Sequence, residues 1–539
     1  MSGPLPVVQA VAAPAAGWWG ERSASFTESA DVVIIGSGPG GAFAALTLAE
    51  AGLDVLLVEE GFHHPNATFS PDVSDSVEHL FQEGGLRTAV GRPPMPVAGG
   101  KALGGSTVVN SAISFRTPEA TLAEWNERSD GAFADTEHYY RTMDAVEAMV
   151  QVGPTPDRLL SGYDRVHKEA ANGLGWSNHN FRRNTPRCAG CGRCNNGCPV
   201  HGKASVDVAV LPRAVRAGCR VITGASVRVV ASGKVEGVVV GRDRTERGTF
   251  TINAKKAVVL SAGAIASPRI LLDSAAVPEG GEVGAGLLVH PVFSVMAYFR
   301  DLVVAAPGSS QGHYVDEFAA ERIILESNPT LPGALFPAIP WWGKEAWEYL
   351  ARGSNWASTG VMVRDESPGR VVGNAGRPGA KIHYDIGEVD RQRAILGMTH
   401  AAQMWLEGAK ATCVTLNVYG APACSTLDEV RAVLEDVPFG RLIGYSSHPQ
   451  ASCSVGRACR HDGEVIGADG IYVIDASSLP LNVGRNPQIS VMTVARVLSE
   501  RLATRLGGTV QPLWQGGALW SVDQAGVPCG LNVAPVATP

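Results

Sequence analysis

The sequence has few charged and few aromatic residues: 18% of its 539 residues are charged and 6% are aromatic. Its formal net charge is -7, so the basic balance that is typical of nucleic-acid-binding proteins is missing. It also has no apolar run close to the roughly 18 residues that a membrane-spanning helix needs. These absences argue against a nucleic-acid partner and against a membrane span, and they favour a large soluble enzyme.

The N-terminal region has no basic stretch before its Ala-, Pro- and Val-rich run, which is unlike a secretory signal peptide. We expect residues 1–29 to be an N-terminal extension and the protein to be cytoplasmic. The 63 glycines and 34 prolines predict many turns, and the length exceeds what one compact core holds. The composition therefore predicts a loop-rich α/β fold with two domains.

The most informative stretch begins with an apolar run at residues 31–35, which is typical of a buried parallel strand. Gly36, Gly38 and Gly41 follow it at the spacing of a dinucleotide-binding turn. The first glycine permits the tight turn, the second lets the backbone approach a pyrophosphate, and the third lets the next helix pack closely. That helix is predicted at 42–51, and its N-terminal amides would face the pyrophosphate.

A second buried strand is predicted at 55–58, and Glu59 follows it directly. An acidic side chain about 20 residues after the glycine turn is placed to accept hydrogen bonds from a ribose. Strand, turn, helix, strand and acid in this order predict a dinucleotide site with Glu59 on the ribose. No second unit of this kind appears in the middle of the chain, which argues against a flavin disulfide reductase with two nucleotide folds.

A second glycine-rich stretch, residues 99–110, has a backbone that can pass close to a flat ligand. Together with the first motif it resembles the flavin-contacting segment of the glucose-methanol-choline (GMC) oxidoreductase family. The further segments that resemble this family are 263–274, 283–291, 447–453 and 463–489. Ala275 stands where the family usually has glycine, a difference expected to alter only a turn. The resemblance extends over roughly residues 30–505.

The resemblance implies a Rossmann-like FAD-binding domain and an interleaved α+β substrate-binding domain built on an antiparallel sheet. The FAD-binding domain would be discontinuous and comprise 30–116, 201–291 and 441–506. The cap would comprise 117–200 and 292–440. Residues 507–539, which contain Trp514 and Trp520, would form a C-terminal tail. The residues for which FAD contacts are implied are Gly36, Gly38, Gly41, Glu59, Gly104, Ser106, Thr107, Asn110, Val227, Asp475, Ala476, Asn486 and Pro487.

Oxidation of an alcohol on a flavin requires a group that accepts the hydroxyl proton while a hydride leaves the same carbon. Histidine suits this role near neutral pH, and His448 lies in the segment that resembles the histidine segment of the family. Asn486 does not titrate, but its amide can donate to the substrate oxygen. The His-Pro and Asn-Pro pairs resemble the cholesterol oxidase and choline oxidase branches. We therefore predict catalysis by His448 and Asn486, and a structural role for His290.

The predicted reaction is FAD-dependent oxidation of an alcohol to a carbonyl, with oxygen or another electron acceptor reoxidising the flavin. Two alternatives stay open. One is a sterol-type oxidase that also shifts a double bond, although the sequence shows no dedicated extra acid for that step. The other is a flavin electron-transfer subunit without its own substrate, and the presence of both His448 and Asn486 argues against it.

A cysteine-rich loop, residues 188–198, is not needed for alcohol oxidation. Cys188, Cys191, Cys194 and Cys198 have the spacing of bacterial ferredoxins. Some GMC dehydrogenases carry an iron-sulfur cluster at a similar place, and such a cluster would give electrons an exit. The alternatives are a tetrahedral zinc ion and a structural loop, whether or not disulfides tie it.

Aromatic residues in the expected cap indicate an apolar or aromatic pocket. A bulky hydrophobic or aromatic alcohol is therefore favoured over a free sugar. The residues considered for the lining are Phe336, Pro340, Trp341, Trp342, Trp347, Trp356 and Trp405. Outside the cap, Lys203 lies in a segment that resembles a family stretch returning to the flavin domain, and we interpret its side chain as solvated.

Overall fold

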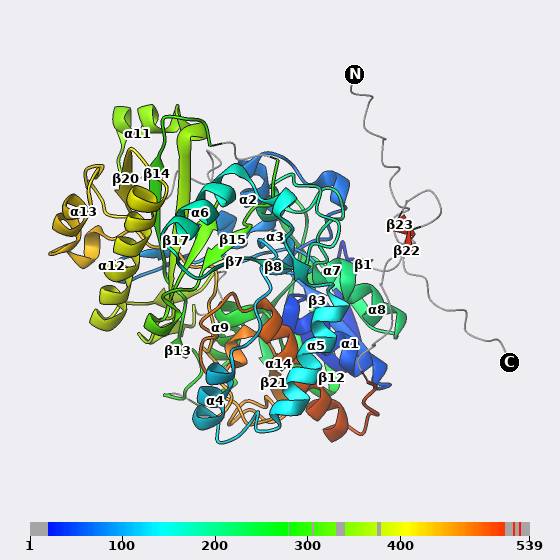
Figure 1. Cartoon of the computed structure of the whole chain (residues 1–539). Coiled ribbons are helices and arrows are strands. Elements are labelled where there is room, and N and C mark those ends of the chain that lie inside the picture. The colour runs from blue at the N-terminus through cyan, green and yellow to red at the C-terminus, as the bar shows by residue number, and fades with distance from the viewer. Residues whose placement is uncertain are drawn as a thin grey trace.

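The structure is a computed structural model that describes residues 20–278, 280–303, 307–329, 340–374, 379–512, 521–522 and 528–529. Within these ranges the chain forms two lobes, each built around its own sheet (Figure 1). No helix in these ranges has both the length and the apolar character needed to cross a membrane. Phe336, Trp514 and Trp520 lie outside the described residues.

The first lobe contains the strand-helix-strand unit that the glycine motif predicts. The buried strand β2 (Phe26–Ile35) leads through the glycine turn into α1 (Pro39–Glu50) and then into β3 (Val55–Glu59). β2 and β3 pair in parallel, as a crossover through one helix requires. β2 begins five residues before the predicted strand because its first half pairs with β12 (Glu246–Leu260). Two parts of the expected N-terminal extension, residues 20–21 and 26–29, are therefore in the sheet.

Eight strands form the first sheet, in the order β1, β9, β3, β2, β12, β11, β10, with β21 also pairing with β12. The bounds of its remaining strands are β1 Gly20–Glu21, β9 Arg220–Thr223, β10 Ala225–Ala231, β11 Lys234–Val240 and β21 Ile471–Val473. The second half of β12 pairs with β2 on one side and with β21 on the other. Segments from the start, middle and end of the chain therefore meet at the carboxyl edge of this sheet.

Helices from distant parts of the chain cover the first sheet. α14 (Gln488–Arg505) is buried along most of its length and packs against α1 and α5 (Thr136–Met149). The apolar side chains of α4 (Glu119–Arg128) and α5 belong to the same core. Residues 117–200 were expected in the cap, but α4 and α5, at the start of this range, pack in the first lobe. α6 (Gly162–Gly173) belongs to the core of the second lobe.

The second lobe is built on a six-stranded antiparallel sheet, as expected for the cap. Its strand order is β20, β14, β17, β16, β15, β7. The strand bounds are β7 Asn178–Asn180, β14 Val292–Tyr298, β15 His313–Val315, β16 Ile323–Asn328, β17 Trp356–Val363 and β20 Cys413–Leu416. α12 (Glu388–Gln403) packs on one face of this sheet and buries alternate residues such as Val295, Leu325 and Val361 (Figure 1).

The opposite face of this sheet carries the side chains that matter for the site. Ser294, Gly360 and Glu326 are paired in register across β14, β17 and β16, so they share one face. Asn328 lies on the same face, and its Nδ2 donates to the hydroxyl of Tyr445 at 2.9 Å. This face of the sheet is therefore connected to the C-terminal segment that contains the predicted catalytic residues.

Smaller elements connect these layers. The remaining helices and strands are α2 Val73–Leu80, α3 Ser106–Val109, α7 Val206–Ala209, α8 Leu211–Arg216, α9 Gly263–Asp273, α11 Gly343–Leu350, α13 Leu427–Leu434, β4 Thr88–Ala89, β5 Met95–Pro96, β6 Gly153–Pro154, β8 Arg182–Arg183, β13 Ala285–Leu287, β18 Gly369–Val372, β19 Lys381–His383, β22 Ser521–Val522 and β23 Pro528–Cys529. Among them, α3 and α9 begin at the carboxyl edge of the first sheet, next to the glycine turn.

Candidate functional site

The glycine turn after β2 is as tight as the sequence predicts. Gly36 has a φ of 97°, and a Cβ there would lie 2.5 Å from the carbonyl oxygen of Ser261. A Cβ at Gly41 would lie 1.9 Å from the carbonyl oxygen of Gly36. Gly38 is the N-cap residue of α1, and no side chain caps this helix. The turn therefore leaves the first amides of α1 available to an anion, as a pyrophosphate site requires.

The second glycine-rich loop lies against this turn. Gly105 comes so close that a Cβ on it would lie 2.7 Å from the Cα of Gly38. The N–H of Gly104 donates to Oγ of Ser37 at 2.9 Å. Two backbones without side chains are thus in direct contact beside the N-terminus of α1, and this close packing requires glycine at both positions.

Glu59 closes the turn from the end of β3. Its carboxylate accepts from the backbone N–H of Ser37 at 2.9 Å, from Oγ of Ser37 at 2.7 Å and from the N–H of Gly61 at 2.8 Å. Burial raises the pKa of Glu59, and these hydrogen bonds partly oppose that effect. The structure thus gives Glu59 a role in holding the turn, and its contact with a ribose stays a prediction.

The other polar residues predicted in the glycine-rich loop bond within the protein. Oγ of Ser106 accepts a backbone N–H of the loop, and Oγ1 of Thr107 donates to the carbonyl of Gly104 at 2.7 Å. Nδ2 of Asn110 donates to Oε1 of Gln488 at 2.9 Å. Ser106 and Thr107 therefore shape the loop, while Asn110 attaches it to the first turn of α14.

Asp475 and its neighbour Ala476 join three segments of the first lobe that are far apart in the sequence. Its carboxylate accepts from the N–H of Gly263 at 2.8 Å and from Oγ of Ser267 at 2.6 Å, both in α9. Its neighbour Ala476 accepts from the N–H of Ala451 at 3.1 Å. Burial raises the pKa of Asp475, again against several hydrogen bonds. This residue fixes the carboxyl edge of the sheet.

Val227, predicted to contact the adenine, lies in β10 and is buried in the first core. It pairs with Gly237 of β11, next to a register shift in β10. β10 is the edge strand of the first sheet, whereas the glycine turn follows β2 near its centre. The adenine contact of Val227 therefore stays a prediction.

His448 lies in a short segment, residues 445–450, that is bridged at both ends to residues 288–292. His290 lies opposite it, and the two rings meet edge to face with their centroids 5.6 Å apart. His290 is fully buried, and its Nε2 accepts from the N–H of Gly484 at 3.1 Å. This environment fits the predicted structural role of His290, because its ring braces the segment that precedes Asn486.

The fold brings His448 and Asn486 together. Nδ2 of Asn486 lies 3.4 Å from Nε2 of His448, and Pro487, the next residue, is the N-cap residue of α14. His448 Nδ1 and Asn486 Oδ1 are buried and have no hydrogen-bond partner in the described protein. Burial lowers the pKa of His448 to about 4, so its imidazole is neutral at neutral pH. The pair therefore offers a proton acceptor beside an amide donor.

The same pair is attached to the glycine-rich loop from both sides. Ser446, two residues before His448, accepts from the N–H of Ala98 at 2.9 Å, directly before the loop begins. Gln488, two residues after Asn486, holds Asn110 at the end of the loop. Segments from near the two ends of the described chain thus meet at one site.

A carboxyl that the sequence analysis did not identify also belongs to this site. Glu326 of β16 is 6% exposed, and its carboxyl lies close enough to the amide of Asn486 for that amide to affect its pKa. Burial raises the pKa of Glu326 to about 7, although Asn486 and Arg485 both act to lower it. Sequence alone gives one signal, a glutamate that directly follows three apolar residues, and that signal does not distinguish a buried residue from a solvated one.

The cysteine-rich loop contains free thiols at all four positions, Cys188, Cys191, Cys194 and Cys198. In the part of the chain that the structure describes, no three His, Cys, Asp or Glu residues are arranged to hold a metal ion. Nη2 of Arg183 donates to Sγ of Cys194 at 3.0 Å. The loop as folded therefore fits neither an iron-sulfur cluster nor zinc, and no disulfide ties it.

The interpretation of Lys203 as a solvated residue is wrong. Its side chain is buried, and Nζ donates to the carbonyls of Val108 at 2.7 Å, Asn110 at 2.9 Å and Cys194 at 2.9 Å. The cysteine-rich loop is thereby fastened to α3 and to the end of the glycine-rich loop. A buried ammonium with three carbonyl acceptors satisfies its hydrogen-bonding capacity without water.

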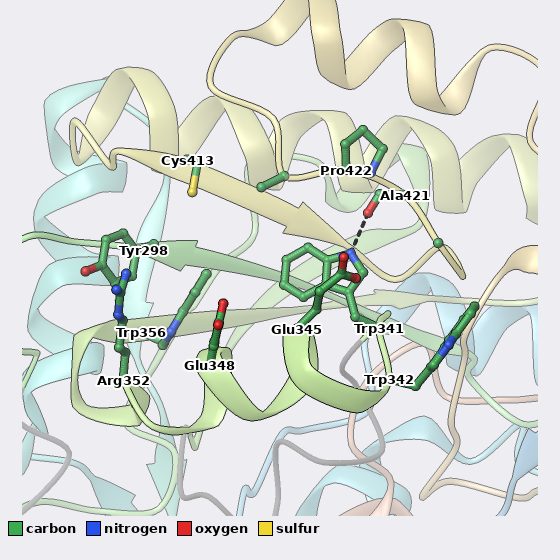
Figure 2. A pocket seen from close by; sticks show the side chains of 12 residues that line it. Tyr298, Trp341, Trp342, Glu345, Glu348, Arg352, Trp356, Cys413, Ala421 and Pro422 are labelled. Carbon is green, nitrogen blue, oxygen red and sulfur yellow. Dashed lines mark hydrogen bonds between the residues drawn. The ribbon is translucent and has the colours of Figure 1, made fainter.

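An aromatic cavity of about 770 Å³ lies beside the edge of the six-stranded sheet. Figure 2 shows the side chains that line it. Of the tryptophans considered for a pocket, Trp341, Trp342 and Trp356 line it. Trp405 lies in the core of the second lobe instead, and Trp347 is 72% exposed. Trp356 of β17 is on the same sheet face as Glu326, four residues and roughly 13 Å along the strand from the row that contains Glu326.

Comparison with known proteins identifies the family. The sequence matches the GMC oxidoreductase family over residues 77–292 and 365–495, and an FAD binding domain over residues 31–70. The chain belongs to the GMC oxidoreductase family. It is therefore an oxidoreductase with an FAD-binding domain, and the glycine turn of β2 lies within the matched FAD segment. The N-terminus of α1, which no side chain caps, fits the pyrophosphate of this cofactor.

Relatives in sequence extend over most of the chain. An uncharacterized GMC-type oxidoreductase of Mycobacterium tuberculosis is 34% identical over 492 residues, which is 89% of this chain and 76% of the relative. A long-chain-alcohol oxidase of Arabidopsis thaliana is 28% identical and is aligned over 88% of this chain and 67% of its own length.

Solved structures share the fold at low sequence identity. A variant of Aspergillus oryzae formate oxidase has a TM-score of 0.64 at 16% identity, with 89% of this chain and 99% of that chain covered. A fungal aryl-alcohol oxidase has a TM-score of 0.61 at 16% identity, with 88% and 99% covered. These similarities establish the GMC flavoenzyme fold. They do not identify the substrate, which has to be inferred from the residues of this chain.

Proposed function

We propose that the protein oxidises the hydroxyl group of an alcohol to a carbonyl with bound FAD as the electron acceptor. The observation that carries this proposal is the contact between Asn486 and His448 in a buried site where each side chain keeps an unpartnered polar atom. Unpaired polar atoms are costly when buried, so they are expected where a ligand supplies the missing partner.

The two residues have different roles in the proposed reaction. The neutral imidazole of His448 accepts the hydroxyl proton, and the amide of Asn486 donates to the substrate oxygen as negative charge develops on it. FAD, when bound, supplies the acceptor for the hydride that leaves the carbinol carbon. The residues that would hold it are those of the glycine turn and the glycine-rich loop, with Glu59 at the ribose.

The proposed substrate class is a bulky hydrophobic or aromatic alcohol. Two observations support this class. Trp341, Trp342 and Trp356 line a cavity on the sheet face that also carries Glu326. Two sequence relatives from Arabidopsis thaliana are named long-chain-alcohol oxidases. Because several relatives are named oxidases, we propose molecular oxygen as the electron acceptor.

Bleaching of the flavin without air tests the function directly. The purified yellow protein is mixed anaerobically with hexanol, dodecanol, hexadecanol, benzyl alcohol and glucose, and the loss of flavin absorbance is followed. Faster bleaching by the longer alcohols or by benzyl alcohol than by glucose is expected. Admission of air then tests the acceptor, since oxygen should restore the colour within the turnover time. Bleaching by none of the alcohols would remove the proposal.

A second candidate function is oxidation followed by a double-bond shift, and Glu326 is the observation that favours it. Such a shift needs a group that moves a proton between carbons, and a carboxyl with a raised pKa can do this. A β,γ-unsaturated steroid ketone offered to the enzyme without air tests this step. Formation of the conjugated ketone by the wild type, but not by Glu326→Gln, is expected for this candidate.

A further inference from the structure

Arg183 is a buried cation whose hydrogen-bond partners are almost all neutral. It is 2% exposed, and its Nε donates to the carbonyl of Ser111 at 2.9 Å. Nη2 donates to Oγ of Ser310 at 3.4 Å and to Sγ of Cys194 at 3.0 Å. Of these partners, only the cysteine can carry a negative charge. Because a buried charge is costly unless an opposite charge lies beside it, this arrangement favours the thiolate form of Cys194.

A second buried cation is bonded to the same cysteine residue. Lys203 is 2% exposed, and its Nζ donates to the backbone carbonyl of Cys194 at 2.9 Å. Burial acts to raise the pKa of Cys194, but Arg183 and Lys203 outweigh that effect and lower the pKa to about 7. A large fraction of this thiol is therefore ionised at neutral pH. The thiolate, and not the thiol, is the form of cysteine that reacts with peroxides.

Arg183 also has one donor without a partner. Its Nη1 is buried and forms no hydrogen bond within the described protein. Nη1 and Nη2 lie side by side in the guanidinium fork, which can hold an acceptor at each nitrogen. Since Nη2 lies 3.0 Å from the sulfur of Cys194, an oxygen atom added to that sulfur can reach Nη1. A buried donor without a partner is expected where a further group supplies one.

We propose that Cys194 is a modification site at which hydrogen peroxide oxidises the thiolate to a sulfenic acid, and that Arg183 holds the added oxygen. The thiolate sulfur attacks one oxygen of the peroxide, so an S–O bond forms while the O–O bond breaks. The sulfur is oxidised by two electrons and the peroxide is reduced by two. The other peroxide oxygen leaves as hydroxide, which solvent protonates to water.

The source of the peroxide rests on the proposed function, because an oxidase that uses oxygen releases hydrogen peroxide. Cys194 lies beside the end of the glycine-rich loop, where that reaction is proposed. Nδ2 of Asn195, the next residue, donates to the carbonyl of Val109 at 3.1 Å, and Lys203 bonds both Cys194 and Asn110. Cys194 is 7% exposed, which favours a small neutral oxidant over a bulky one.

Added hydrogen peroxide tests the site without turnover. The FAD-loaded protein carries Cys188→Ser, Cys191→Ser and Cys198→Ser, so no other thiol of the loop consumes the sulfenic acid. After a timed exposure at neutral pH, catalase removes the peroxide. The protein is then denatured in dimedone, which labels sulfenic acids, and mass spectrometry of peptides locates the label. Labelling of Cys194 should be at least tenfold faster than labelling of Cys219.

Cys219 is the internal control because it is similarly buried and lacks this environment. It is 3% exposed, its Sγ donates to the carbonyl of Arg220 at 3.4 Å, and burial raises its pKa to about 12. Equal rates at the two cysteines would overturn the proposal. If the triple variant does not fold, the wild-type chain gives the same comparison, with oxidation measured as the loss of thiol that can be alkylated after denaturation.

Two variants test the role of Arg183. Arg183→Lys keeps the positive charge, whereas Arg183→Met removes the charge and all its donors. We expect oxidation of Cys194 to be at least tenfold slower in Arg183→Met and only severalfold slower in Arg183→Lys. Both variants lose the fork, so added glutathione should consume their sulfenic acid severalfold faster. Wild-type rates of both steps in Arg183→Lys would refute this role of Arg183, even if Arg183→Met does not fold.

Turnover in air tests the source of the oxidant separately. The alcohol that bleaches the flavin fastest should lead to labelling of Cys194 in air but not under anaerobic conditions. His448→Ala is the matched control, because it should be labelled by added peroxide and not by alcohol. Labelling by added peroxide without labelling during aerobic turnover would overturn the assigned source. Absence of any alcohol oxidation would instead refute the proposed function, and the reaction of Cys194 with added peroxide would still decide the modification site.

Discussion

Nδ2 of Asn486 lies 3.4 Å from Nε2 of His448, although 38 residues separate the two in the sequence. The segment of His448 is bridged to residues 288–292, and Asn486 stands at the start of α14. Neither residue reaches the other through local structure. The contact therefore depends on both lobes being folded, and it links the predicted chemistry to the fold.

Replacement of His448 by alanine should remove the proton acceptor and leave the FAD in place. The rate of flavin reduction by a good alcohol should fall at least roughly 100-fold, as expected for loss of a positioned base. Flavin absorbance per protein, measured after gel filtration, is the control for cofactor binding. Asn486→Ala should cause a smaller loss, because the base remains. A His448→Ala protein with full colour and nearly normal reduction would exclude this histidine from the mechanism.

The pH dependence of reduction should reveal the unusual environment of His448. Burial lowers the pKa of His448 to about 4, from an ordinary value of 6.5. The neutral form accepts the proton, so activity should persist as the pH falls below 6.5 and should decline only near pH 4. The Glu326→Gln variant is the suitable background, because it lacks the carboxyl that titrates near pH 7. Rapid mixing limits unfolding of the protein in acid. A rate of flavin reduction that halves near pH 6.5 would contradict the lowered pKa of His448.

The glycine turn was predictable from the sequence because its requirements are local. Gly36 and Gly41 leave no room for a Cβ against neighbouring backbone, and a short motif records that need directly. The strand-helix-strand order around them follows from apolar runs of the right length. His448 and Asn486 were predictable for another reason, since each lies in a segment that resembles a family motif.

Burial between distant segments was not predictable in this way. Lys203 looks like a surface residue in the sequence, yet three carbonyls from two other segments surround its ammonium group. Glu326 lies at a polar position between two neighbours that point to the opposite face, as expected for the exposed face of a sheet. It is buried because that face packs against the first lobe. The cysteine spacing suggested a metal site, but spacing alone does not fix where the thiols point.

Gly105→Ala tests the close approach of the two glycine-containing backbones. Gly105 has φ 55° and ψ -143°, a backbone conformation that residues other than glycine avoid. A Cβ there would also lie 2.7 Å from the Cα of Gly38. We expect the dissociation constant for FAD to rise at least about tenfold, which corresponds to ~1.4 kcal/mol. Gly153→Ala is the matched control, because no atom lies within 4 Å of its added Cβ.

Lys203→Met tests whether the cysteine-rich loop supports the flavin site. The change removes three hydrogen bonds to carbonyls and leaves those carbonyls buried, so the free energy of unfolding should fall by about 3 kcal/mol or more. Release of FAD on heating, followed by flavin fluorescence, should occur at a lower temperature. Lys344→Met is the control, since that side chain is 89% exposed and its surface ion pair is worth about 1 kcal/mol at most. Equal effects of the two changes would refute this role.

Stability in acid should depend on a buried histidine pair outside the active site. Nδ1 of His167 lies 2.8 Å from Nδ1 of His313, and burial lowers the pKa of His167 to about 3 and that of His313 to about 2. One ring must donate and the other must accept, so both rings are neutral when folded. In the unfolded chain each takes up a proton below about pH 6.5, the ordinary value. Unfolding therefore binds protons, and stability falls as the pH drops from 6.5 toward 3.

The His167→Phe variant isolates this contribution. Each histidine of the pair adds up to about 1.4 kcal/mol per pH unit to the acid dependence of the unfolding free energy. Urea unfolding of wild type and variant at several pH values between 4 and 6.5 should give a smaller slope for the variant, because one proton uptake is lost. His313 then titrates without its partner. The slope is the informative quantity, and an unchanged slope would mean that His167 is protonated in the folded protein.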